Sequence, residues 1–339
     1  MEGEKRILIT GANGFIGGFL VKEALQRGYD VWAGIRPDSS RENLQDERIH
    51  FICLNYDDKE ALTEQLREQV AISGAWRYVI HNAGITKTVH IDTFYKVNAR
   101  YTNMLIESLA SAGCKPEKFL LMSSLGSYGP VHERSCTPIR IDDRQQPDSD
   151  YGKSKLQAET FLKAQTYFSY IILCPTGVYG PGDKAYLMEI KSIKARFDFK
   201  AGMKPQRITF IYVKDLVVAA FLALENPQVR NTSYFVTDGK AYTDCEFARL
   251  VKKMLGKRFV INLRIPLWLL YVICVFMELA GKIVKRPVTL NTDKFKIFRQ
   301  RNWLCEMERT FSELGFIPHY NLEEGLKETI CYCKENGFL

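Results

Sequence analysis

A tyrosine and a lysine one helical turn apart, Tyr151 and Lys155, are the residues of this sequence best suited to acid–base chemistry. On a helix, side chains at i and i+4 project from one face. An ammonium group beside a phenol lowers the phenol pKa, so Tyr151 could exchange a proton with a substrate oxygen while hydride moves to or from a nicotinamide. Lys155 could also hold ribose hydroxyls. Because a chain with 17 tyrosines contains about one such spacing by accident, the surrounding elements decide its meaning.

A glycine-rich turn near the N-terminus has the spacing of a dinucleotide pyrophosphate site. An apolar run at 6–9 predicts a strand, and Gly11, Gly14 and Gly17 follow it directly. The first glycine permits a tight turn, the second lets the backbone approach phosphate, and the third lets the next helix pack on the strand. The N–H groups at the start of that helix then face the anion. The residues expected to contact the cofactor here are Gly11, Asn13, Gly14, Phe15, Ile16 and Gly17.

The end of the second expected strand, 30–36, bears on which dinucleotide is bound. A site selective for NAD places a carboxylate there against the ribose hydroxyls. This chain has Ile35 and Arg36 instead, followed by Ser39, Ser40 and Arg41. A guanidinium can bind a ribose 2′-phosphate with two donors, so NADP is favoured over NAD. The alternative is that Arg36 is a solvated loop residue.

Alternating strands and helices in the first half predict an α/β fold with a Rossmann-type, doubly wound parallel sheet. Further strands are expected at 49–54, 78–81, 119–122 and 170–174, and helices at 61–70 and 94–112. Ligands bind such sheets beyond the carboxyl ends of the strands. The small and polar residues expected to line that crevice are Asn55, Asn82, Ala83, Gly84, Ser123, Ser124, Pro175 and Thr176.

The length of 339 residues allows one large α/β unit or a domain with a smaller partner. We expect residues 1–180, with 207–240 returning to them, to form the dinucleotide-binding domain. Residues 181–206 and 241–339 are expected to form a smaller, mostly helical substrate-binding region.

Cysteine and histidine usage predicts a reducing, cytoplasmic setting without a metal site. Nine cysteines are scattered without a CxxC pair, and residues 1–5 lack the apolar core of a secretion signal. The five histidines show no HxxxH or similar ligand spacing, so no metal is expected.

With the glycine turn, Ser124 and the Tyr151–Lys155 pair in this order, the chain resembles the extended short-chain dehydrogenase/reductases, the NAD-dependent epimerase/dehydratase superfamily. Nucleotide-sugar epimerases and 3β-hydroxysteroid dehydrogenases are its most similar branches. The resemblance covers nearly the whole chain. Its further motifs are Asn82-Ala83-Gly84, Val97-Asn98, the run 175–182, the run 210–215, and Glu313-Leu314-Gly315-Phe316.

The resemblance implies a role for each matched residue. Ser124 would hydrogen-bond the reacting oxygen, Tyr151 would be the acid or base, and Lys155 would tune it. Asn55 and Tyr56 would meet the adenine, although many relatives have aspartate at the position of Asn55. The other implied cofactor contacts are Asn82, Ala83, Gly84, Asn98, Pro175, Thr176 and Val178, and the implied substrate contacts are Thr86, Tyr179 and Arg207.

Two features bear on the branch of the family. Similar sugar-nucleotide dehydratases have a Thr-Asp-Glu run near Ser124, but Leu125 and Gly126 follow here, so no carboxylate is present to eliminate water. An epimerase needs only the same serine, tyrosine and lysine. Arg207, shortly before the expected strand at 210–213, could hold a diphosphate, form a structural ion pair or bind a substrate carboxylate.

The segment 265–284 is apolar and lies in the most basic part of the chain. Residues 266–277 carry no charge, yet the run is short for a bilayer span, which needs about 20 apolar residues. Residues 256–301 contain ten basic and two acidic residues, an excess equal to the chain's net charge of +8. A buried helix is one interpretation, and peripheral membrane contact through 265–286, or binding of a lipid-like substrate, is another. No interleaved aromatic and basic module supports a nucleic-acid partner.

Pro287, Leu290, Lys294 and Trp303 fall at spacings that resemble 3β-hydroxysteroid dehydrogenases. The leading hypothesis is therefore an NAD(P)-dependent oxidoreductase that interconverts a secondary alcohol and a ketone on an apolar, sterol-like or other small molecule. A UDP-sugar 4-epimerase is the alternative, and a non-catalytic dinucleotide sensor is a third. The resemblance also implies a homodimer through the helices that carry Phe94 and Tyr151. A cytoplasmic protein, with association to a membrane, fits these expectations.

Overall fold

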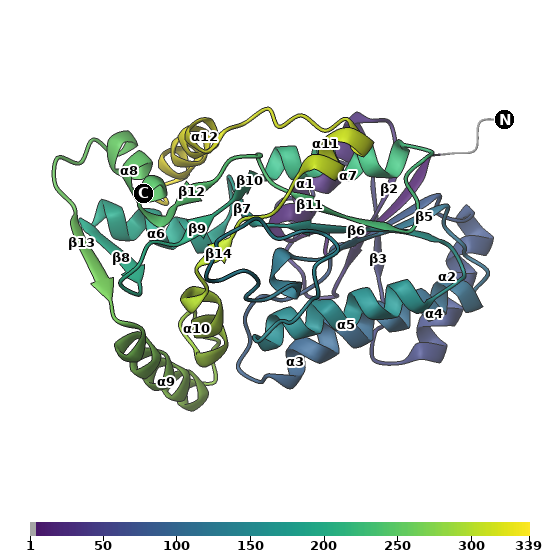
Figure 1. Cartoon of the computed structure of the whole chain (residues 1–339). Coiled ribbons are helices and arrows are strands. Elements are labelled where there is room, and N and C mark those ends of the chain that lie inside the picture. Colours follow the sequence, from purple (N-terminus) through teal and green to yellow (C-terminus); the bar gives the residue numbers. More distant parts are fainter. Residues whose placement is uncertain (1–4) are drawn as a thin grey trace.

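Seven parallel strands form the central sheet of the computed structural model, which describes residues 5–339 (Figure 1). Their order is β11-β6-β5-β4-β1-β2-β3. The strands are β1 (Arg6–Thr10), β2 (Asp30–Ile35), β3 (Ile49–Cys53), β4 (Tyr78–His81), β5 (Lys118–Met122), β6 (Ser169–Pro175) and β11 (Thr232–Val236). β4 and β5 are buried throughout, as expected for strands covered on both faces. The predicted Rossmann-type fold is confirmed.

Helices cover both faces of this sheet. On one side lie α1 (Phe15–Gln26), α7 (Val213–Glu225) and α11 (Glu308–Leu314), and on the other α2 (Lys59–Ser73), α4 (Tyr101–Ser111) and α5 (Asp150–Ala164) (Figure 1). The strand order reverses between β1 and β4, and β1 pairs with both β2 and β4. Such a reversal opens a crevice for a ligand at the carboxyl ends of the strands.

The helix expected at 94–112 is interrupted. The structure has α3 (Asp92–Phe94), a π-helical turn η1 (Tyr95–Arg100) and then α4. π-Helical turns often occur at functional sites. Asn98 lies within η1 and is buried.

A second hydrophobic cluster lies beyond the sheet, around Tyr179, Phe210, Tyr212 and Phe247. It is built from α6 (Lys184–Lys194), α8 (Asp244–Met254), α12 (Leu322–Glu335) and the paired strands β7 (Gly177–Tyr179) and β10 (Phe210–Tyr212). The remaining short strands are β8 (Phe197–Ala201), β9 (Arg207–Ile208), β12 (Tyr242–Thr243), β13 (Ile261–Ile265) and β14 (Asn302–Trp303). The predicted domain boundaries stay a prediction, as does the N-terminal expectation for residues 1–4, which lie outside the described residues.

The apolar segment 265–284 forms helix α9 (Leu267–Val284), followed by α10 (Thr292–Arg299). The interpretation of α9 as a buried helix is wrong, because only 17% of it is buried. The buried residues of α9 are Leu270, Cys274 and Gly281, and its other residues are exposed or half-buried. With 18 residues, α9 is long and apolar enough to cross a membrane by length and composition alone.

Candidate active site

The glycine turn after β1 has the shape that a bound dinucleotide requires. Gly11 has a φ of +65°, and its N–H donates to the Gly34 carbonyl over 3.0 Å. A Cβ on Gly17 would lie 2.1 Å from the Gly11 carbonyl oxygen, so only glycine lets α1 approach β1 this closely. Gly14 precedes α1, and within residues 5–339 no side-chain hydrogen bond caps the start of this helix. The first N–H groups of α1 can therefore bind phosphate, with Asn13, Phe15 and Ile16 at its rim.

The adenine end of the crevice lies beyond β2 and β3. Arg36 is exposed, and its backbone N–H donates to the Ser39 hydroxyl over 3.2 Å. Tyr56 stacks on Tyr101 with ring centroids 4.9 Å apart. The Asn55 side chain accepts a hydrogen bond from the backbone of the next turn, so it shapes this loop.

Asn98 connects the loop after β4 to α5 through hydrogen bonds. Its amide oxygen accepts from the Ile85 N–H over 2.8 Å, and its amide nitrogen donates to Ser154 on α5 over 3.0 Å. A Cβ on Gly84 would lie 3.0 Å from the Asn98 amide oxygen and 3.6 Å from the Lys155 amine. Asn82 and Ala83 are hydrogen-bonded to the β1 end, through the Gly11 carbonyl and the Thr10 hydroxyl respectively. Asn98 is thus a positioning residue for this part of the crevice.

The structure brings the three predicted catalytic residues together. Tyr151 and Lys155 lie on the first two turns of α5, and Ser124 lies two residues after the end of β5. The Lys155 amine donates to the Met122 carbonyl over 2.7 Å. A Cβ on Gly126 would lie 3.3 Å from the Ser124 hydroxyl and 3.5 Å from the Tyr151 ring, so the two side chains flank one glycine. This arrangement can hold a carbonyl oxygen between two hydroxyl groups.

Burial dominates the electrostatics of this pair. It raises the pKa of Tyr151, and the neighbouring Ser124 hydroxyl opposes the rise. It lowers the pKa of Lys155 to about 8, while the Glu159 carboxylate opposes that change. The expectation that the lysine lowers the tyrosine pKa is therefore wrong for the protein alone, because burial has the larger effect.

Sequence reasoning missed Glu159, a buried carboxylate one turn beyond Lys155 on α5. It accepts hydrogen bonds from the Ser123 hydroxyl and, over 2.8 Å, from the Gln145 amide. Its i+4 spacing from Lys155 was a usable signal, since such residues share a helix face. Glu159 provides a negative charge that favours the charged form of Lys155.

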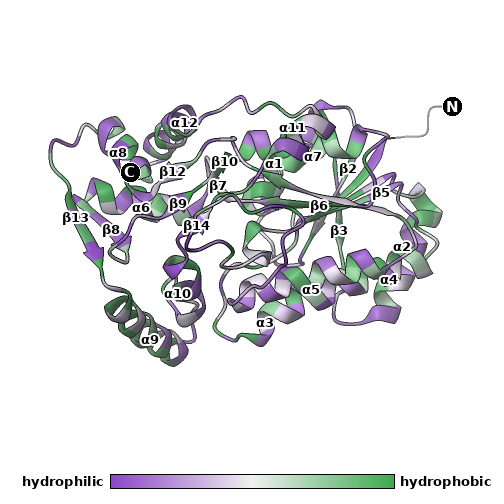
Figure 2. Ribbon diagram, in the orientation of Figure 1, coloured by the Kyte–Doolittle hydropathy of each residue, from purple (hydrophilic) through white to green (hydrophobic). Residues whose placement is uncertain are grey.

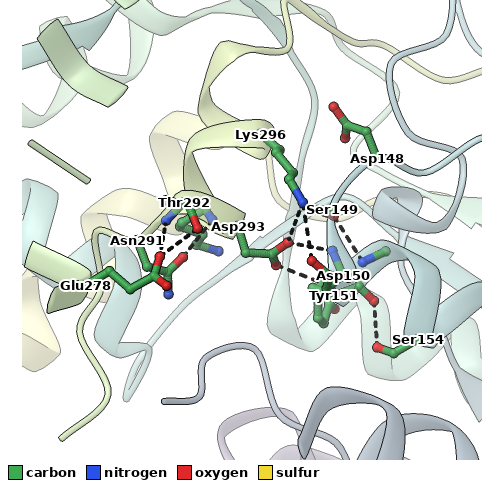
Figure 3. A network of polar contacts seen from close by, with 12 residues as sticks. Asp148, Ser149, Asp150, Tyr151, Ser154, Glu278, Asn291, Thr292, Asp293 and Lys296 are labelled. Atoms are coloured by element: carbon green, nitrogen blue, oxygen red, sulfur yellow. Dashed lines mark hydrogen bonds and ion pairs between the residues drawn. The ribbon is translucent and has the colours of Figure 1, made fainter. Parts of the chain in front are cut away.

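Sequence reasoning also missed a network of polar contacts that joins α9 and α10 to the start of α5 (Figure 3). The Asp293 carboxylate on α10 accepts hydrogen bonds from the backbone N–H groups of Asp150 and Tyr151 at the start of α5. Thr292 donates through both its backbone and its hydroxyl to Glu278 on α9. Burial opposes ionisation of Glu278, but hydrogen bonds from Lys282 and Thr292 outweigh it and lower its pKa to about 2. α10 therefore holds both α9 and the catalytic helix.

We predict that Asp293→Ala lowers the free energy of unfolding by about 1–2 kcal/mol, because two N–H groups at the start of α5 lose their acceptor. Turnover should fall as well, since one of these N–H groups belongs to Tyr151. Asp148→Ala is the matched control, because Asp148 pairs with Arg299 of α10 at a more exposed position. Asp148→Ala should lower the free energy of unfolding by less than about 1 kcal/mol. If urea unfolding gave equal losses of unfolding free energy for the two variants, Asp293 would stabilise the fold no more than a surface ion pair does.

A small pocket with a cavity volume of about 20 Å³ lies between the loop after β4 and the helices α9 and α10. Its apolar lining includes Val89, Ile91, Phe94 and Val288. The ring of Phe94 packs edge-on against Tyr151 at 6.0 Å between centroids. The Phe94 ring therefore contacts both the pocket and Tyr151, which does not itself line the pocket. Its polar lining is Thr88, Glu278, Lys282, Arg286, Asn291, Thr292 and Asp293.

The other predicted site residues lie in different parts of the structure. Thr86 is exposed on the loop after β4, and Arg207 is exposed on β9. Tyr179 is buried in the second cluster and donates to the Asn321 carbonyl over 3.3 Å, a packing role that gives no support to substrate contact. Pro175 and Val178 lie around the end of β6 beside Thr176, whose hydroxyl is buried without a partner in residues 5–339. Such an unpaired hydroxyl fits a segment that meets a cofactor amide.

The part of the chain described by the structure contains no group of three or more histidine, cysteine, aspartate or glutamate side chains placed to hold a metal ion. The glycine cradle at Gly17 and the unpaired Thr176 hydroxyl instead fit a dinucleotide.

Comparisons with known proteins agree with this geometry. Residues 7–236 match the model of the NAD dependent epimerase/dehydratase family. A UDP-glucose 4-epimerase from Vibrio cholerae is 28% identical over 96% of this chain and 94% of its own. A 3-beta-hydroxysteroid dehydrogenase from Mycolicibacterium neoaurum is 23% identical over 96% of this chain and 91% of its own. The Bordetella bronchiseptica enzyme WbmG, solved with NAD and UDP, superposes with a TM-score of 0.76 at 18% identity over 99% of this chain and 96% of its own. The chain therefore belongs to the NAD-dependent epimerase/dehydratase family, and it is an NAD-binding oxidoreductase of the extended short-chain dehydrogenase/reductase type.

Proposed function

We propose that this enzyme interconverts a secondary alcohol and a ketone on an apolar small molecule, with NADP(H) favoured over NAD(H) as its cofactor. The observation that carries the proposal is the small pocket lined by Phe94, whose ring packs on Tyr151; its other apolar walls are Val89, Ile91 and Val288. Small-molecule sites combine apolar walls with polar groups that orient the ligand, and this pocket joins four apolar residues to seven polar ones. The outer wall is formed by Glu278, Gly281 and Lys282 of α9.

In this mechanism, the bound nicotinamide supplies hydride for reduction or accepts it in oxidation. During ketone reduction, Tyr151 donates its phenolic proton to the substrate oxygen as the carbonyl carbon gains hydride. Ser124 donates a second hydrogen bond to the same oxygen and stabilises its developing negative charge. The Lys155 ammonium lies one turn along α5 and stabilises the phenolate that remains on Tyr151. Alcohol oxidation uses the same groups in reverse.

The first experiment is to denature freshly purified protein and identify any released nucleotide and its oxidation state. Exchangeable NADP(H), or little bound nucleotide, supports an enzyme that releases its cofactor at each turnover. Hydride transfer with sterol-like and other apolar alcohols would then be assayed by absorbance. Tightly held, stoichiometric NAD would count against this proposal, because an epimerase recycles its cofactor in place.

A UDP-sugar 4-epimerase is the second candidate. The similarity to the Vibrio cholerae epimerase extends over almost the whole of both chains, and Arg207 is an exposed cation available to a diphosphate. Calorimetric titration with UDP-glucose separates the candidates. Binding that is lost in Arg207→Ala favours the epimerase, and absence of binding removes it.

The pH profile of ketone reduction should show a single limb on its alkaline side. Burial raises the pKa of Tyr151, so the phenol stays protonated and ready to donate through the neutral range. The ammonium of Lys155 loses its proton as the pH rises through about 8. We expect kcat/KM to be level below this pH and to fall about tenfold per unit above it. Lys155→Arg, which stays charged, should remove the limb, and an unchanged limb would assign it to another group.

Arg36→Glu should reverse the cofactor preference. If the Arg36 guanidinium binds the 2′-phosphate, its loss and the added carboxylate should lower kcat/KM with NADPH by about 10–100-fold. The same carboxylate can accept hydrogen bonds from the ribose hydroxyls of NADH, whose kcat/KM should rise. Arg48→Glu is a control, because Arg48 is an exposed arginine paired with Asp46. An unaltered ratio of the two cofactors in Arg36→Glu would make Arg36 a solvated loop residue.

A further inference from the structure

Helix α9 lies at the edge of the molecule, and most of its ribbon has the colour of hydrophobic residues (Figure 2). The exposed fractions are 70% for Trp268, 68% for Phe276 and 82% for Ile283. On its inner side, Tyr271 packs on Phe295 of α10 with ring centroids 5.2 Å apart. α9 is therefore held by α10 along one side, and its other side has no partner within residues 5–339.

The two-stranded ribbon before α9 extends this surface. β8 and β13 are parallel, and their register places Phe197 opposite Ile261 and Phe199 opposite Leu263. All four side chains are exposed, whereas Asp198 between them is buried on the other face. β13 leads into α9 through Pro266 alone. We call the combined surface the apolar face; its residues are Phe197, Phe199, Ile261, Leu263, Trp268, Phe276 and Ile283.

Exposed cations lie before and after the elements of the apolar face. Residues 256–301 carry ten basic and two acidic residues. Arg258 is exposed before the ribbon, and Lys285 and Arg286 are exposed directly after α9. The acidic residue of α9, Glu278, is already paired with Lys282 over 2.8 Å. An apolar surface with exposed cations at its edge complements an anionic surface with an apolar interior, which is the chemistry of a lipid bilayer.

The fold favours a helix that lies in the plane of the bilayer. A helix of 18 residues is about 27 Å long, slightly less than the hydrocarbon core. Both of its ends are also fixed to the same folded unit, since β13 pairs with β8 and Asp293 of α10 caps the catalytic helix. A helix that crossed the membrane would place its ends on opposite sides and break one of these connections.

We propose that the apolar face docks the enzyme on an anionic lipid bilayer, with α9 embedded in the plane of the headgroups. Docking requires only this surface and is independent of the substrate. α9 also contributes Glu278, Gly281 and Lys282 to the cavity beside Phe94. α9 therefore lies between the bilayer and the pocket. Delivery of an apolar substrate from the bilayer beside this helix rests on the proposed function.

Vesicle flotation of the full chain tests the docking without any assay of activity. Vesicles of phosphatidylcholine with phosphatidylglycerol should carry the protein upward, and vesicles of phosphatidylcholine alone should carry much less. Trp268 provides a second readout, because Trp32 and Trp76 are buried and Trp303 is half-buried. Its fluorescence should shift to the blue when vesicles are added. Trp268→Phe should keep flotation and lose the shift.

The triple variant Trp268→Ser, Phe276→Ser and Ile283→Ser should bind anionic vesicles at least about a hundredfold more weakly, since three large side chains no longer enter the lipid. Ile72→Ser with Ile317→Ser is the matched control, because these side chains are 81% and 74% exposed outside the apolar face. The control should bind like the wild type. Because all the substituted side chains are exposed, the thermal unfolding midpoints should stay near that of the wild type.

A charge-reversal pair tests the choice of lipid. Lys285→Glu with Arg286→Glu should weaken binding to anionic vesicles by about tenfold or more, while Lys22→Glu with Lys115→Glu, an equal charge change elsewhere on the surface, should have a much smaller effect. Failure of the wild type to float, or equal flotation by the triple variant, would overturn the proposal. So would a dimer in light scattering that only the triple variant dissociates, because a second copy would then cover the apolar face.

Discussion

Tyr151→Phe should lower kcat for hydride transfer by about 10²–10⁴-fold and leave the fold intact. The substitution removes one hydroxyl and keeps the ring, which packs edge-on against Phe94. The backbone N–H of residue 151 still donates to Asp293. Without the phenol, Ser124 is left as a hydrogen-bond donor to the substrate oxygen, and the proton transfer assigned to Tyr151 is lost. The decrease is measured in single-turnover absorbance of the reduced nicotinamide, with cofactor affinity determined separately.

Tyr95→Phe is a control of equal chemistry for this experiment. Its hydroxyl donates to the Asp150 carboxylate over 2.8 Å, so it lies close to the start of α5 but bonds a protein group. We expect less than about a tenfold change in kcat, because only one hydrogen bond near the helix start is lost. A Tyr151→Phe enzyme that transferred hydride at the wild-type rate would contradict the assigned role. It would favour a protein that binds dinucleotide without acid–base catalysis.

The local parts of the site could be predicted because their physical requirements lie in neighbouring residues. Gly17 must lack a side chain so that α1 can approach β1, and this need is visible from the strand and the helix on either side of it. Tyr151 and Lys155 share a helix face through their spacing alone. The parallel sheet follows from short, nearly continuous apolar runs separated by helices. These features explain why the fold and the meeting of the three catalytic residues could be anticipated.

The interrupted helix shows what hydrophobic periodicity misses. The residues of η1 keep a helical pattern, and only the hydrogen-bonding register changes, so no residue type marks the π-helical turn. Its purpose becomes clear from the contacts of Asn98, which bonds both the Ile85 backbone and Ser154. Those partners come from two other elements of the chain.

The C-terminal region was harder to predict because its role depends on distant partners. An apolar run reads equally well as a core helix or a surface helix, and only the packing of α9 on α10 reveals that most of it is exposed. Asp293 looks like an ordinary residue in the first turn of a short helix. Its carboxylate nevertheless caps α5, a contact between residues more than a hundred positions apart.

Ser124→Ala should lower kcat/KM by about 10²–10³-fold, the cost of removing one donor to a developing oxyanion. The Ser124 oxygen accepts a hydrogen bond from the Gly126 N–H over 3.0 Å, which leaves its own O–H free to donate toward the substrate. Steady-state reduction kinetics measure the loss. If the hydroxyls of Ser124 and Tyr151 act on one oxygen, the double variant with Tyr151→Phe should lose less than the product of the two separate losses.

Ser127→Ala separates this role from packing. Ser127 lies three residues further along the same turn, and its hydroxyl donates to the Ser124 carbonyl over 2.9 Å and accepts from Gln145 over 3.0 Å. Its removal should lower the free energy of unfolding by about 1 kcal/mol and change kcat/KM by less than about tenfold. Equal kinetic losses in the two variants would mean that the turn needs its hydrogen bonds for shape, and that Ser124 does not touch the reacting oxygen. A large loss in Ser124→Ala alone would place its hydroxyl at the substrate, since both serines belong to one short turn and only Ser124 lies against Gly126 and the Tyr151 ring.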